Sequence, residues 1–87
     1  MNNLNELLSA LERMIFELKR NGKNELASFF SLRYEEIKKD SDRVPYDVIE
    51  ELSTCRAMSQ YANFSLKEEE LLDAVVDSAI AAKNAIP

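Results

Sequence analysis

Residues that form turns are so scarce in this chain that they constrain its fold more than any other feature does. Only one glycine and two prolines occur in 87 residues. An all-β domain needs turn residues about every eight to twelve positions, so this scarcity favours helices joined by short loops. The composition, 46% apolar and 31% charged, is that of a globular protein and not of a disordered chain. We therefore predict one all-α domain over residues 1–87.

Apolar residues recur at the three- and four-residue spacing of one helix face in four segments. Asn21-Gly22 is a stop signal for the first helix, and Pro45 suits the first turn of the third. Ser65 with Glu68 three residues later has the form of a capping box for the fourth. Short connections make sequential helices antiparallel, which predicts a compact four-helix bundle. The predicted helices span residues 3–20, 24–39, 45–60 and 65–84.

The apolar stripes also predict which side chains form the core. The aromatic pair Phe29-Phe30 is the largest apolar mass and should anchor it. In the third helix the expected inward stripe is Val48, Leu52, Cys55 and either Met58 or Ser59. The residues predicted to be buried are Leu8, Leu11, Ile15, Phe30, Leu52, Val75 and Val76.

Acidic residues are concentrated in one part of the chain. Residues 40–77 hold ten acids and three bases, a net charge of −7, whereas residues 1–39 hold seven bases and six acids, a net charge of +1. Such an asymmetry within one small domain indicates a partner more than a fold. A direct nucleic-acid ligand is disfavoured, because the densest charge has the wrong sign for phosphate.

Several classes of site are not predicted. Histidine, the commonest general base and transition-metal ligand, does not occur. The run Glu68-Glu69-Glu70 is interpreted as a solvated face and not as a metal site, because helical di-iron bundles pair such glutamates with histidine. Cys55 lies on an apolar stripe and is interpreted as an inert thiol. We predict no catalytic residue, metal or cofactor, and no enzyme activity.

The expected location is the cytoplasm. A single cysteine excludes an internal disulfide. No apolar run approaches the roughly 20 residues of a membrane span, and the N-terminus lacks the basic region of a signal peptide. No membrane partner is predicted.

The acids of the third and fourth helices lie near aromatic residues that the stripes do not clearly bury. Aromatic anchors combined with complementary charge are typical of protein interfaces, although acidic faces often serve only solubility. We predict that a basic protein docks on this surface. The predicted partner-binding residues are Tyr46, Asp47, Glu50, Glu51, Tyr61, Phe64, Glu69, Asp73 and Asp77.

Two stretches resemble a group of small helical bacterial immunity proteins. One is the segment Asn21-Gly22-Lys23-Asn24-Glu25-Leu26-Ala27-Ser28-Phe29-Phe30, which follows a leucine-rich helix. The other is Cys55-Arg56-Ala57-Met58-Ser59-Gln60-Tyr61-Ala62-Asn63-Phe64. The chain is similar to immunity proteins of contact-dependent inhibition and colicin D-type systems. The resemblance implies a helical inhibitor of a toxin domain.

The sequence therefore leads to one main hypothesis and one alternative. In the first, the chain binds and neutralises a cognate toxin with a basic surface, for which a nuclease is the expected class and transfer RNA a candidate substrate. In the alternative, it is a self-associating structural or regulatory protein, a homodimer with no toxin partner. A toxin-like reading frame next to the gene would favour the first.

Overall fold

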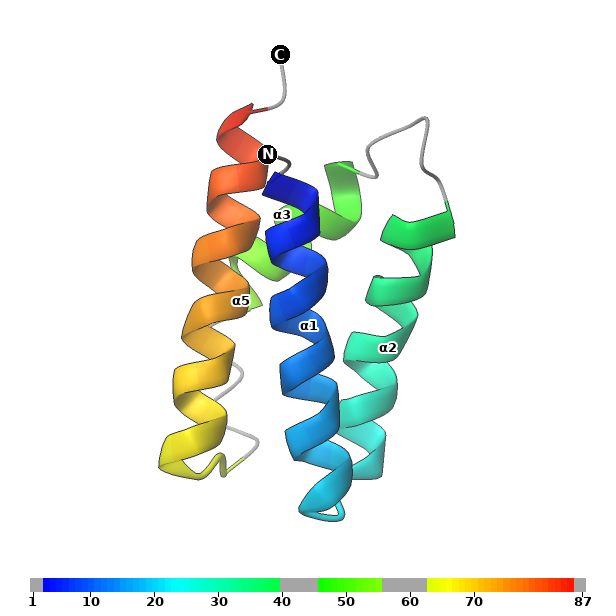
Figure 1. The fold of residues 1–87 in the computed structure, drawn as a ribbon, viewed down its shortest axis with the longest axis vertical. Coiled ribbons are helices and arrows are strands. Elements are labelled where there is room, and N and C mark those ends of the chain that lie inside the picture. The colour runs from blue at the N-terminus through cyan, green and yellow to red at the C-terminus, as the bar shows by residue number, and fades with distance from the viewer. Residues whose placement is uncertain (1–2, 40–45, 56–62, 86–87) are drawn as a thin grey trace.

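The computed structural model describes residues 3–39, 46–55 and 63–85. Its three longer helices lie side by side, and a shorter helix runs obliquely behind them (Figure 1). No strand occurs within these ranges. The predicted all-α four-helix bundle is therefore confirmed. The helices are α1 (Asn3–Arg20), α2 (Asn24–Lys39), α3 (Tyr46–Ser53) and α5 (Leu66–Ala85).

The helices alternate in direction around the core. Helix α1 packs between α2 and α5, and the short α3 packs mainly on α5 with a smaller contact to α2. The turn between α1 and α2 and the start of α5 lie at one end of the bundle, and the C-terminus of α5 lies at the other (Figure 1). Within the described part of the chain, no helix combines the length and the apolar character needed to cross a membrane.

Five of the seven residues predicted to be buried are in the core: Leu11, Phe30, Leu52, Val75 and Val76. The predictions for Leu8 and Ile15 were wrong, because both are only partly buried against the core. The fully buried seam of α1 is instead Leu7, Leu11, Met14 and Leu18. Leu8 and Ile15 are seven residues apart and so lie together at the edge of that seam. The apolar stripe predicted for α1 was therefore displaced to one side of the seam that is actually buried.

The turn between α1 and α2 closes as the sequence predicts. The amide of Lys23 donates to the carbonyl of Leu18 at 2.8 Å, and the amide of Gly22 donates to that of Lys19 at 3.1 Å. These are the two bonds of a Schellman motif. Gly22 has φ of +78°, a conformation in which a residue without a Cβ is favoured.

Helix α3 is shorter than predicted within the described residues. The α-helix ends at Ser53, whereas the sequence pattern predicts continuation to residue 60. The Ser53 hydroxyl donates to the carbonyl of Glu50 at 2.7 Å, and the Thr54 hydroxyl donates to that of Glu51 at 3.2 Å. Such hydroxyls compete with helical amides for the last carbonyls. Residues 56–60 of the predicted helix lie outside the described residues.

Candidate protein-binding face

Three of the predicted partner-binding acids form a row along α5. Glu69, Asp73 and Asp77 follow one another at four-residue intervals, so they lie on the same side of the helix. All three side chains are exposed. Asp73 and Asp77 also interact with other groups of the chain. The apolar side chain of Ile80 is 41% exposed near the end of this row.

Helix α3 brings two further acids next to α5. Asp47 and Glu50 are exposed, and a Glu50 carboxylate oxygen lies 3.7 Å from Nζ of Lys83 on α5. Helix α3 packs on α5, so the exposed acids of these two helices lie on neighbouring elements. We call five of the exposed acids of the two helices the acidic face; its members are Asp47, Glu50, Glu69, Asp73 and Asp77.

Glu51 belongs to a different contact. Its carboxylate accepts two hydrogen bonds from Arg33 of α2, from Nε at 3.1 Å and from Nη2 at 3.0 Å. The Arg33 guanidinium also lies 3.9 Å from the centre of the Phe29 ring. Such a two-point pair fixes geometry, so Glu51 joins α3 to α2 and is not counted among the acids available to a partner.

The three predicted aromatic anchors have different outcomes. Tyr46 is the first residue of α3 and is 42% exposed, as expected of an anchor. Phe64 is only 8% exposed, so the prediction that it is left uncovered was wrong. Its ring packs in the core with Nζ of Lys23 5.4 Å from its centre. Tyr61 lies outside the described residues.

Glu68 has a role that the sequence pattern only half predicts. Its amide donates to the Ser65 hydroxyl at 3.1 Å and its carboxylate accepts from the Ser65 amide at 2.8 Å, which confirms the capping box. The carboxylate also accepts from Nδ2 of Asn21 and from Nζ of Lys23, both at 2.6 Å. The side chain is fully buried. The prediction that Glu68 belongs to a solvated face was therefore wrong.

This network joins the turn between α1 and α2 to the start of α5. Lys23, in the turn after α1, also donates to the carbonyl of Asn63 at 3.0 Å. Asn21 donates a second bond to the nearly buried Glu17 at 3.3 Å. A buried charge is tolerated only when it is paired and hydrogen-bonded, and each polar atom of the Glu68 side chain has such a partner.

Burial and hydrogen bonding act on Glu68 in opposite directions. Burial raises the pKa of its carboxyl group, whereas the hydrogen bonds from Lys23, Asn21 and Ser65 and the charge of Lys23 lower it. The combined effect is a lowered pKa. Glu68 is therefore a structural carboxylate that stays ionised at neutral pH.

The described residues contain no group of three or more histidine, cysteine, aspartate or glutamate side chains placed to hold a metal ion. Cys55 is partly buried, and its thiol donates to the carbonyl of Leu52 at 3.1 Å. In comparisons with known proteins, no family model, no curated protein and no solved structure matches this chain.

Proposed function

We propose that this chain is an immunity protein, which binds a cognate toxin through the acidic face and neutralises it. The toxin carries a basic surface; a nuclease is the expected class, and an enzyme acting on transfer RNA is the narrower candidate. The proposal rests first on the resemblance of two sequence stretches to helical immunity proteins. The single structural observation that supports it most is the exposed row of Glu69, Asp73 and Asp77.

The acidic face has the properties of a surface that attracts a nuclease. A nuclease holds phosphate in a basic cleft, and carboxylates at similar spacing can occupy such a cleft. Long-range attraction between opposite charges also raises association above the neutral rate of about 10⁵–10⁶ M⁻¹s⁻¹. Fast capture suits an inhibitor whose target damages its own cell.

Two exposed apolar side chains adjoin the acids. Tyr46 on α3 and Ile80 on α5 are each about two-fifths exposed. Apolar anchors of this kind slow dissociation, whereas charges at the rim mainly speed encounter. We expect Tyr46→Ala to raise the dissociation rate from the toxin and to leave the association rate nearly unchanged.

The direct test is to co-express the chain with the product of a neighbouring toxin-like gene and to measure binding kinetics. Reversal of the row on α5 (Glu69→Lys, Asp73→Lys, Asp77→Lys) should slow association at least about tenfold at low salt. The effect should shrink as salt is raised, because exposed charges are screened.

A matched control changes the same number of charges on α2, with Glu25, Glu35 and Glu36 each replaced by lysine. These glutamates are exposed and do not belong to the acidic face. They should affect association much less. Equal effects of the two triple variants would mean that only net charge matters, and unchanged binding in both would mean that the toxin docks elsewhere.

A further inference from the structure

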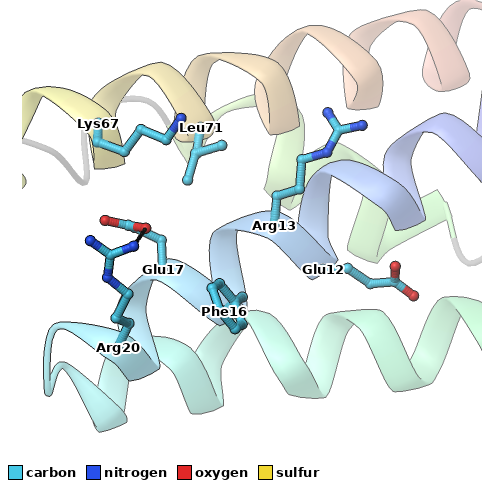
Figure 2. Close-up of a pocket in the computed structure, with 7 residues that line it drawn as sticks. All are labelled: Glu12, Arg13, Phe16, Glu17, Arg20, Lys67 and Leu71. Carbon is cyan, nitrogen blue, oxygen red and sulfur yellow. Dashed lines mark ion pairs between the residues drawn. The ribbon is translucent and has the colours of Figure 1, made fainter.

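A hollow of about 420 Å³ lies between α1 and α5, on a part of the surface not used in the proposed function (Figure 2). Its floor is apolar, formed by Phe16 of α1 and Leu71 of α5. Phe16 is 67% exposed. Removal of an aromatic ring from water is favourable, so a partner that covers Phe16 would be stabilised by this contact.

The charges around this floor are mainly positive. Figure 2 shows Arg13 and Arg20 on α1 and Lys67 on α5 around the hollow. The two acids that line it have partners of their own. Glu12 points away and accepts a bond of 2.5 Å from the Tyr34 hydroxyl of α2. Glu17 accepts from Asn21 and also forms an ion pair of 3.9 Å with Arg20 (Figure 2), so Arg20 is the one rim cation among the described residues that already has an acidic neighbour in this hollow. The hollow therefore offers an apolar floor with a cationic rim.

An exposed apolar side chain with negative charges beside it lies next to the hollow in the sequence. Leu66, the residue before Lys67, is 82% exposed, the highest value among the large apolar side chains that remain exposed in the described residues. Glu69 and Glu70 follow Leu66 by three and four residues, so they lie one turn further along the same side of α5. Both are exposed. Leu66 with its two carboxylates matches the apolar floor and cationic rim of the hollow.

We propose that the hollow receives Leu66 of a second copy of this chain, so that the protein forms a two-fold symmetric dimer. In such a dimer one patch contacts the same patch on the partner. Leu66 of each copy covers Phe16 and Leu71 of the other. The carboxylates of Glu69 and Glu70 meet the arginines across the interface.

The adjacency of the two surfaces is what favours a closed dimer. Leu66 and Lys67 are consecutive residues, and Lys67 lines the hollow. The side chain that inserts and the hollow that receives it therefore lie close together on one molecule. Two copies can then satisfy both contacts at once, whereas widely separated surfaces would produce an open chain of molecules. A standard interface buries about 800 Å² per partner, roughly a seventh of the 5619 Å² that this chain exposes. An interface of this size that is partly charged gives a reversible dimer.

The test uses the full chain alone, so its result does not depend on whether a toxin partner exists. Analytical ultracentrifugation from about 10 µM to 1 mM should reveal a reversible monomer–dimer equilibrium ending at twice 10.0 kDa. Phe16→Glu should weaken dimerisation at least about thirtyfold, since it places a carboxylate on the apolar floor. Leu32→Glu is the matched control: Leu32 is 61% exposed on α2, outside the patch, and its replacement should leave the dimer unchanged. Helical content, measured by circular dichroism, checks that both variants fold.

A charge exchange tests the symmetry. One variant carries Arg13→Glu and Arg20→Glu, and a second carries Glu69→Lys and Glu70→Lys. Each should be monomeric alone, because its own patch has become like-charged. A mixture of the two should form a heterodimer, since both contacts are then between opposite charges. A wild-type chain that is monomeric at 1 mM, species that grow beyond the dimer, or a mixture that fails to associate would each overturn the proposal.

Discussion

Glu68 and Glu69 are neighbours in the sequence, but they belong to regions of opposite character. Glu68 lies at the end of the bundle that holds the α1–α2 turn. It is fully buried and hydrogen-bonded to Lys23, Asn21 and Ser65. Glu69 lies on the acidic face, exposed. A helix turns its side chains by about 100° per residue, and this alone sends one carboxylate inward and the other outward. The same residue type therefore holds the fold together in one region and is available for recognition in the other.

The largest expected effect comes from breaking the buried network. Glu68→Ala should lower the free energy of unfolding by about 3 kcal/mol, because it leaves Lys23 and Asn21 without their partner. Glu69→Ala, the matched control, should change it by no more than about 0.5 kcal/mol. Urea unfolding of both variants measures the difference. Equal losses would show that the buried and exposed carboxylates do not differ in the way described.

The second expected effect is on the pH dependence of stability. The pKa of Glu68 is lower in the folded chain than its usual value of 4.5, so the ionised carboxylate favours the folded state. This contribution is complete above the usual pKa and is lost as the pH falls through the folded pKa. Glu68→Gln should therefore lose less stability than the wild type between about pH 5 and pH 3.

Glu69→Gln, compared over the same pH range, should follow the wild type closely. Unfolding by urea at several pH values gives both curves. A Glu68→Gln variant with the same acid sensitivity as the wild type would mean that other carboxylates cause the acid response.

A smaller effect is expected at the pair that joins α2 to α3. Arg33 and Glu51 make two short bonds, but the Glu51 side chain is 47% exposed. A double-mutant cycle with Arg33→Ala and Glu51→Ala should give a coupling energy of about 0.5–1 kcal/mol. Arg33→Ala alone should cost more than Glu51→Ala, because it also removes the contact with the Phe29 ring. A coupling energy as large as the stability lost in Glu68→Ala would mean that this half-exposed pair contributes as much as the buried network does.

The smallest effect is expected at Glu50 and Lys83. Their charged atoms are 3.7 Å apart and both side chains are at least one-third exposed, so the coupling energy should be below about 0.5 kcal/mol. It should vanish in high salt, as exposed pairs are screened. Thermal unfolding at low and high ionic strength measures it. Persistence of the coupling in high salt would indicate a more buried pair than the one described.

The sequence predicts the local features well and the long-range ones poorly. The bounds of α1 and α2, the stop at Gly22 and the Ser65–Glu68 cap depend on residues within four positions of one another, and all were confirmed. The partners of Glu68 are 45 and 47 residues away, and no spacing rule links them. Ser53 and Thr54 did carry a signal for the end of α3, since hydroxyls favour helix ends.

The acidic face was only partly predictable for the same reason. Exposure of Glu69, Asp73 and Asp77 follows from helix periodicity on α5. The burial of Phe64 and the pairing of Glu51 with Arg33 depend on how separate helices meet. The exposure of Phe16 was not predicted, because the apolar spacing of α1 identifies the inward side of the helix and Phe16 lies on the outward side.

The bond between Lys23 and Glu68 has a consequence for the rate at which the fold is lost. The α1–α2 hairpin can form from contacts close in sequence, but Lys23 and Glu68 are 45 positions apart and meet only after the chain between them has been closed into a loop. An interaction that forms after the rate-limiting step of folding slows unfolding and leaves the folding rate nearly unchanged. We therefore expect the bonds of Glu68 to slow unfolding and so to lengthen the lifetime of the folded bundle, with little effect on how fast it forms.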